Sequence, residues 1–485
     1  MSALSVLLQV VVLTHATVID PDSPRSRRDQ TIVVRGTRIA AVGPSASTPV
    51  PPGARVVNAT GKFVIPGLWD MHVHTDVPGG RAMLPLYIAH GVTGVRDMNG
   101  RLEVVRGLQR EVTAGTLVGP RMVVSGPFLV GRPLPPELGI PSYLVRDSAS
   151  AVAAVTAVAA SGADFLKVHN GIPAEAYRVV AAEARRHGMV FAGHVAAPTT
   201  VEQAAASGQR SQEHLYAFTN PCTGAESAVV AAALPIQQFV MGACTSASQA
   251  GVYAAIARHR TWVTPTLIVQ ELVAKMRPTI VAGDQTAQFY SEAMMQRVAM
   301  EMELPPTPPP SAIAAGAMLF RKRMQVVRGL HAAGVPLLGG TDSPLAAGGP
   351  GASLVGELRY LVAAGLSPRE ALRTVTTEPA RYFATDSVGA VAPGQLADLV
   401  VLDADPLTDI GHVARVDVVV ANGRVYDRVA RAALVEDARQ AAPPVARQAA
   451  QRAVQAPLGT WRLVSRTDSS SRGVEPADGP LGADP

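Results

Sequence analysis

Two histidines, His72 and His74, follow an apolar run that extends from Phe63 to Leu68. Side chains alternate along a strand, so residues two apart project from the same face. Both imidazoles can therefore reach one metal ion. Two imidazoles fill only half of a tetrahedral shell, so a metal site here needs ligands from elsewhere in the chain. Taken alone, the pair is equally well explained by hydrogen-bonded core histidines.

Residues of ligand type recur where later strands are predicted to end. Asp97, Lys167, His194, His214 and Asp342 each close a short apolar or β-rich run. Chemistry in a barrel of parallel strands lies at the C-terminal strand ends. Because several such residues occupy equivalent places, the pattern favours a metal site over isolated core histidines.

Lys167 is unusual because the chain strongly prefers arginine. Of 43 basic residues only Lys62, Lys167, Lys275 and Lys322 are lysines. A lysine that ends a buried strand is costly to leave charged and unpaired. A neutral lysine can react with carbon dioxide to give a carbamate, an anion with two oxygens that can bridge two metal ions. The alternative is an ordinary ion-paired lysine.

The middle of the chain alternates strand-like runs with alanine-rich helical segments, the pattern of repeated β–α units. We therefore predict an α/β fold with a (β/α)8 TIM-like barrel. The expected strand ends lie near His74, Asp97, Pro127, His169, His194, His214, Leu267 and Asp342. Expected helices include residues 81–90, 149–161 and 174–187.

The two ends of the chain share a different pattern, with short β-rich runs broken by turns. Such runs occur in residues 10–57 and return in 389–424, where Asn422-Gly423 is a strong hairpin signal. We predict a discontinuous small β-sandwich domain built from both ends. The expected divisions are 1–64 and 388–438 for the two parts of this domain, 65–387 for the barrel and 439–485 for a tail.

The tail and two long insertions are less regular. We expect a helix from about Arg439, and Gly459 to Ser465 resembles the opening strand of small lipocalin-like domains, so the tail is interpreted as a truncated segment of that kind. Residues 219–248 and 276–310 are expected to be long loops, either functional lids or connectors.

Composition excludes several classes of protein. With 48% hydrophobic and 17% charged residues and a net charge of +5, the chain reads as a compact globular protein without a basic stripe for nucleic acid. The apolar start, Met1 to Leu13, lacks a basic beginning and is shorter than the ~20 residues of a membrane span. We favour a cytoplasmic protein, with export left open. Cys222 and Cys244 could pair only if the protein were exported.

Taken together, these motifs over residues 10–430 resemble the metal-dependent amidohydrolase superfamily, in its imidazolonepropionase-like and prolidase-like branch. The residues that carry the resemblance are His72, His74, Lys167, His194, His214, the turn 340–342 and the returning segment 389–405. The resemblance implies two divalent ions, usually zinc. It implies that His72, His74 and Asp342 hold one ion, that His194 and His214 hold the other, and that carboxylated Lys167 bridges them.

The chemistry of such a site is the hydrolysis of a carbon–nitrogen bond in an amide, dipeptide, N-acyl amino acid or cyclic amide. Two divalent ions lower the pKa of a bridging water and polarise a carbonyl. Asp342 is then the natural general base. His169, Tyr216 and Glu213 could contact substrate or orient ligands, or could simply pack.

Two alternatives remain open. The same two metals could serve a lactone or phosphotriester hydrolase, because activated water attacks those centres too. A non-catalytic metal-binding barrel is the alternative from another class. For the enzyme we expect a small-molecule amide or peptide substrate and a homo-oligomer.

Overall fold

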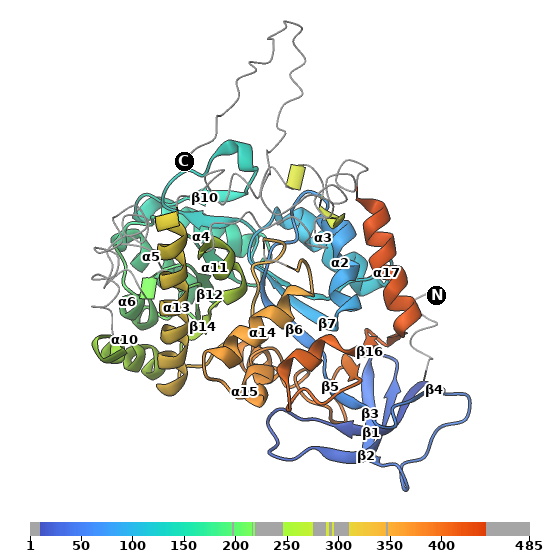
Figure 1. Cartoon of the computed structure of the whole chain (residues 1–485). Coiled ribbons are helices and arrows are strands. Elements are labelled where there is room, and N and C mark those ends of the chain that lie inside the picture. Colours follow the sequence, from blue (N-terminus) through green and yellow to red (C-terminus); the bar gives the residue numbers. More distant parts are fainter. Residues whose placement is uncertain are drawn as a thin grey trace, which may run out of the picture.

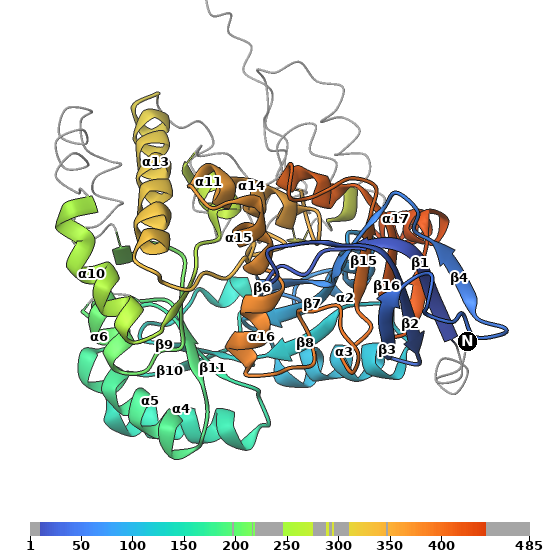
Figure 2. The same ribbon diagram turned by 90° about the horizontal axis from the view of Figure 1, so that it is seen from below.

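The computed structural model describes residues 10–195, 198–215, 217–218, 246–274, 288–290, 293–294, 310–345 and 348–442. A large α/β body carries a smaller sheet at one side, which contains strands from the start and the end of the chain (Figures 1 and 2). Tyr216, both cysteines, most of the two predicted insertions and the predicted lipocalin-like segment lie outside the described residues. No helix of the described residues is long and apolar enough to cross a membrane.

Parallel strands form the inside of the large body. The three-stranded sheet contains β6 (Leu68–Val73), β7 (Val92–Asp97) and β8 (Arg121–Val124). The six-stranded sheet has the order β10-β9-β11-β12-β13-β14. Its strands are β9 (Phe128–Val130), β10 (Ser142–Leu144), β11 (Leu166–Val168), β12 (Phe191–Gly193), β13 (Ser211–Glu213) and β14 (Trp262–Thr264). All pairs within both sheets are parallel, as alternating β–α units require.

The eighth predicted strand, ending at Asp342, is not a regular strand. Isolated parallel bridges join Val263 to Leu337 and Val73 to Ser343, so this segment lies between β14 and β6. The regular ladders remain two separate sheets and do not close into one continuous barrel sheet. The expected strand position is therefore right, while its expected regular pairing is wrong.

Two other predicted strand ends are displaced. β8 ends at Val124 rather than near Pro127, and the chain then enters the extra strand β9. β14 ends at Thr264, and Leu267 instead begins helix α11. Thr266 between them has a φ of 50°, a left-handed backbone conformation that departs from the extended backbone of a regular strand.

Helices follow the strands and cover the sheets from outside (Figure 2). The three predicted helical segments are confirmed within a residue at each end, and local signals explain their limits. Asp147, for example, accepts a hydrogen bond from the Ser150 N–H in a capping box that starts α4. The helices are α2 (Gly80–Ala89), α3 (Leu102–Ala114), α4 (Ser148–Ala160), α5 (Ala174–Arg186), α6 (Val201–Ala206), α10 (Ser246–Arg258), α11 (Leu267–Ala274), α13 (Pro310–Ala332), α14 (Ser353–Ala363), α15 (Pro368–Arg373), α16 (Thr377–Phe383) and α17 (Arg428–Ala441).

The two chain ends meet in one eight-stranded sheet with the order β17-β16-β15-β5-β1-β2-β3, in which β4 also pairs with β1. Its strands are β1 (Val10–Val18), β2 (Arg27–Arg35), β3 (Arg38–Pro44), β4 (Arg55–Asn58), β5 (Phe63–Pro66), β15 (Leu399–Leu402), β16 (Val416–Ala421) and β17 (Arg424–Tyr426). Pairing of Val400 with Ile65 joins the two ends. A discontinuous sheet was predicted correctly, but a separate sandwich is not confirmed because the described strands form one sheet.

Strand β15 explains why this sheet belongs to two cores. Leu399 and Val401 lie in the core of the eight-stranded sheet, whereas Val400 and Leu402 lie in the core of the large body. A strand buried on both faces reads as a continuous apolar run. The predicted hairpin follows, with φ values of 50° at Asn422 and 75° at Gly423 between β16 and β17. Helix α17 extends from Arg428 to Ala441, so it contains only the first residues of the helix expected from Arg439, and the rest of that expected helix lies outside the described residues.

Candidate metal centre

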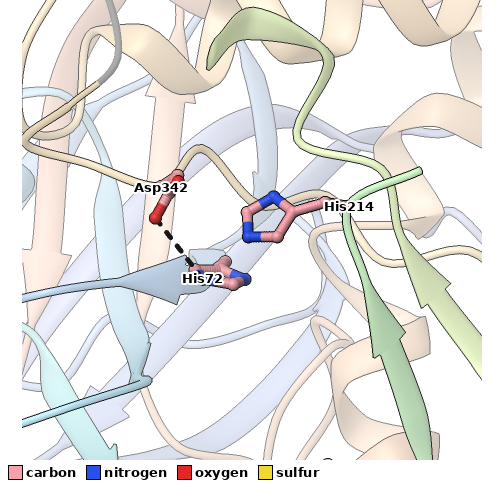
Figure 3. Close-up of side chains that lie close together, drawn as sticks. All are labelled: His72, His214 and Asp342. Carbon is pink, nitrogen blue, oxygen red and sulfur yellow. Dashed lines mark ion pairs between the residues drawn. The ribbon is translucent and has the colours of Figure 1, made fainter. Parts of the chain in front are cut away.

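Three of the predicted ligands meet at the C-terminal ends of the parallel strands. His72, His214 and Asp342 each offer one ligand atom, and these atoms lie within 4.8 Å of one another (Figure 3). His72 is on β6, His214 directly follows β13, and Asp342 lies in the segment between β14 and β6. All three side chains are buried. Imidazole nitrogen and carboxylate oxygen are donors that Zn²⁺ and similar divalent ions accept.

His74 reaches the same carboxylate from the end of β6. Its Nε2 lies 3.0 Å from Asp342 Oδ1, and His72 Nε2 lies 3.4 Å from that oxygen. The rings of His72 and His74 project to one side, as expected for residues two apart in a strand. His72, His74 and Asp342 therefore converge as the sequence predicted.

Unusual backbone conformations position two of the clustered residues. His214 has a φ of 64° and Asp342 a φ of 61°, both in the left-handed region that non-glycine residues seldom occupy. Such conformations cost of order 1–3 kcal/mol each and persist where the surroundings enforce them. Here they turn both side chains inward immediately after a strand or strand-like segment.

Each of three histidines has its Nδ1 held by a separate oxygen. His72 Nδ1 contacts Glu213 Oε2 at 2.9 Å, His194 Nδ1 contacts Asn170 Oδ1 at 2.9 Å, and His214 Nδ1 contacts Thr266 Oγ1 at 2.6 Å. An Nδ1–H that donates leaves Nε2 with the lone pair for a metal. Asn170 and Thr266 were not predicted from sequence, because each acts by contacting a histidine that follows the neighbouring strand of the sheet. Glu213, which the sequence left open as a substrate contact, an orienting residue or simple packing, contacts the ring of the ligand candidate His72.

The remaining predicted histidines complete a circuit of aromatic rings. His214 lies 4.8 Å from His194 between ring centroids, His194 lies 4.2 Å from His169, and His169 lies 4.6 Å from Phe128. Phe128 lies 6.1 Å from His74, which returns the circuit to His72. His169 thus lies between the ring of the ligand candidate His194 and the phenyl ring of Phe128, tilted against both. No sequence feature marked Phe128 as a residue of the site.

Lys167 lies on β11 and is fully buried. Its Nζ has no hydrogen-bond partner among the described residues, and it lies 5.7 Å from the centre of the Phe128 ring. Burial lowers the pKa of this ammonium to about 8. An unpartnered buried amine among histidines fits a group that becomes an anion and binds metal.

Burial favours the neutral form of the His72, His194 and His214 imidazoles near pH 7. Burial lowers the pKa of His72 to about 4 and that of His214 to about 3, and it brings the pKa of His194 well below its ordinary value. Burial would raise the pKa of Asp342, but the contacts with His72 and His74 hold it below its ordinary range. Neutral imidazoles and an ionised carboxylate are the forms that bind a cation, so the donor set fits a divalent metal.

Two buried charged groups near the cluster were also missed. Arg96 on β7 bonds Glu213, and Asp70 accepts hydrogen bonds from the Thr341 N–H and Oγ1 at 3.0 and 2.6 Å. The sequence feature that could have indicated both residues is a charged residue within an apolar strand, which is also the feature that drew attention to Lys167. Asp97, considered as a ligand, instead accepts hydrogen bonds from the Thr75 N–H and Oγ1.

The Amidohydrolase family model matches residues 63–426 of the chain. An adenine deaminase of Rubrobacter xylanophilus is 33% identical over 102 residues, which are 19% of this chain and 17% of that protein. A dihydroorotase of Solibacter usitatus is 45% identical over 69 residues, 14% of this chain and 15% of that protein. Each match thus spans only about a sixth of the relative's length.

Solved structures match over nearly the whole chain at lower identity. A bottromycin amidohydrolase has a TM-score of 0.69 and 22% identity, covering 90% of this chain and 93% of that one. A Xaa-Pro dipeptidase with bound methionine in its active site has a TM-score of 0.63 and 21% identity, covering 86% of this chain and 100% of that one. At such identity the likeness establishes the fold alone, which is the TIM barrel.

Proposed function

Because the chain belongs to the amidohydrolase family, we propose that it is a metal-dependent hydrolase of a carbon–nitrogen bond in a small amide or peptide. The observation that carries this proposal is the cluster of His72, His214 and Asp342, whose ligand atoms lie within 4.8 Å of one another. The names of the similar proteins support hydrolysis of a carbon–nitrogen bond. They are a dipeptidase, an amidohydrolase, a dihydroorotase and a deaminase.

The proposed centre holds two divalent ions, with zinc the first candidate. His72, His74 and Asp342 would hold one ion, and His194 and His214 the other. When bound, such ions would polarise a substrate carbonyl and lower the pKa of water. Support for the first group is the 3.0 and 3.4 Å approach of the two histidines to Asp342, and for the second it is the 4.8 Å separation of the His194 and His214 rings.

Lys167 would bridge the two groups as a carbamate. The neutral amine adds to carbon dioxide, a carbon–nitrogen bond forms, and one proton leaves to water. The pKa of about 8 makes the neutral amine accessible near neutral pH, and arginine could not react in this way. The unpartnered buried position of Nζ supports this role.

Asp342 would be the general base. Its carboxylate accepts a proton from the attacking water as the new carbon–oxygen bond forms, and then delivers that proton to the leaving nitrogen as the carbon–nitrogen bond breaks. Glu213 would act through His72, whose ring it orients. His169 would contact substrate from its place beside His194, while the same role for Tyr216 stays a prediction from sequence.

The deciding experiment combines metal analysis with turnover. Protein purified without chelator is assayed for metals per chain and for activity on N-acyl amino acids, dipeptides, cyclic amides, lactones and phosphotriesters. Two metals with amide hydrolysis support the proposal. Activity confined to lactones or phosphotriesters favours the alternative electrophile, and bound metal without turnover favours a binding barrel.

A further inference from the structure

Arg96 is a completely buried arginine inside strand β7. Its guanidinium makes four hydrogen bonds: Nε donates to Met71 O at 2.7 Å, Nη1 to Ser211 Oγ at 2.8 Å, and Nη2 to Glu213 Oε1 at 2.8 Å and Thr264 Oγ1 at 3.2 Å. One side chain thereby ties β7 to β6, β13 and β14. The centre of the Tyr382 ring lies 4.8 Å from the guanidinium carbon.

The contacts of Arg96 fall directly beside ligand candidates. Met71 precedes His72, and Glu213 precedes His214. Arg96 therefore touches the backbone next to one ligand candidate and the side chain next to another. A guanidinium is needed for this, because its planar fork presents donors in several fixed directions, whereas a lysine presents them from one atom.

Both oxygens of the Glu213 carboxylate have hydrogen-bonding partners. Oε1 accepts from Arg96 and from Ser211 Oγ, and Oε2 contacts Nδ1 of His72 at 2.9 Å. The side chains of Arg96 and Glu213 are fully buried, so the carboxylate cannot turn to water. Its only remaining direction is toward the His72 ring, which fixes the imidazole with Nε2 facing Asp342.

We propose that Arg96 and Glu213 are positioning residues for the metal centre: Arg96 fixes the Glu213 carboxylate, which holds His72 in the tautomer and orientation that bind a metal ion. This inference rests on the proposed function. The competing explanation is a buried ion pair that only stabilises the barrel. The two explanations differ in whether breaking the pair changes metal affinity.

The test measures metal affinity by competition with a chromophoric chelator, alongside thermal unfolding of the metal-free protein. The variants are Arg96→Met, Glu213→Gln and the double variant. We expect each single change to weaken Zn²⁺ binding at the His72 site by about 10–100-fold. The double variant should be no weaker than the worse single variant, because both changes interrupt one chain of contacts. Arg96→Lys should fail to restore affinity.

Arg121→Met is the matched control. Arg121, the first residue of β8, also pairs with a carboxylate, at 2.6 Å between its Nε and Asp398 Oδ2, but this pair links the large body to the eight-stranded sheet and is not beside a ligand candidate. This variant should keep the affinity of the wild type.

The outcomes separate the two proposals. Wild-type protein that binds no metal overturns the proposed function and this inference together. Metal binding by the wild type with unchanged affinity in Arg96→Met and Glu213→Gln overturns this inference alone, especially if unfolding temperature falls. Should Arg96→Met not fold, Glu213→Gln, which keeps the size of the side chain, decides the question by the same affinity measurement.

Discussion

The backbone N–H of Asp342 donates a 2.7 Å hydrogen bond to the carbonyl oxygen of His72. The bond joins the last parallel segment of the barrel to the first strand at the proposed metal centre itself. Two residues far apart in sequence thus share one backbone contact and approach each other through their side chains. Any change in the position of one is transmitted to the other.

The first prediction concerns Asp342→Asn. The amide keeps the shape of the carboxylate but cannot accept a proton, so we expect kcat for amide hydrolysis to fall by about 10²–10⁴-fold. Steady-state kinetics measure the loss, and circular dichroism should show an unchanged fold. Turnover within a few-fold of the wild type would remove Asp342 from the role of base.

The second prediction concerns Lys167→Arg. Arginine keeps a positive charge but cannot form a carbamate, so the variant should bind fewer metal ions per chain than the wild type. Native mass spectrometry should find the added mass of one carbon dioxide on the wild type and not on the variant. An equal metal content in both proteins, with no added mass on either, would contradict a bridging lysine.

How far the sequence predicted this site depends on the kind of residue. His72, His74 and Asp342 stand at predicted strand ends, where position and residue type mark them as ligand candidates, and the family resemblance implies that they share one ion. Arg96 acts through contacts with strands distant in sequence, and Asn170 and Thr266 each contact a histidine that follows the neighbouring strand. No local sequence pattern reports such contacts. Only the presence of an arginine in a buried strand could have drawn attention to Arg96.

The fold shows a similar division. Alternating strand and helix signals predicted the barrel, and Asn422-Gly423 predicted the hairpin between β16 and β17 of the eight-stranded sheet. The sandwich was expected because strands at both ends looked alike, but Val400 and Leu402 face the core of the large body. An apolar run such as β15 does not reveal whether its second face meets another sheet or a barrel.

The third prediction concerns Gly340→Ala. An added Cβ at Gly340 would lie 2.7 Å from Thr264 Cγ2 and 2.9 Å from both the Cβ and the backbone nitrogen of His72. The strand that carries His72 would have to shift, so we expect a loss of about 1–3 kcal/mol in the free energy of unfolding together with weaker metal binding. Denaturant unfolding and chelator competition measure the two effects.

Gly107→Ala is the control for this prediction. Gly107 lies inside helix α3 with an Arg110 Nη2 at 4.0 Å as the nearest atom to an added Cβ. Alanine there should raise stability by about 0.5–1 kcal/mol, because it favours the helix. If Gly340→Ala behaved like this control, the packing between Gly340 and His72 would not constrain the site.

The fourth prediction concerns pH and Glu357, a completely buried glutamate on α14. Its Oε2 accepts a hydrogen bond from the Ile268 N–H at 2.8 Å, at the start of α11, and its Oε1 has no partner among the described residues. Burial raises the pKa of Glu357 from 4.5 to about 8. Folded protein therefore keeps this proton over a pH range in which unfolded protein has lost it.

Between those two pKa values the folded state binds one more proton at Glu357 than the unfolded state. Stability must then fall as pH rises, with a contribution from this group of about 1.4 kcal/mol per pH unit. Glu357→Gln cannot ionise, so the stability of the variant relative to the wild type should increase from pH 5 to pH 8. Urea unfolding at several pH values measures this difference. Glu175→Gln, at an exposed position on α5, should show a flat difference, and an equally flat result for Glu357→Gln would mean that Glu357 is already ionised in the folded protein.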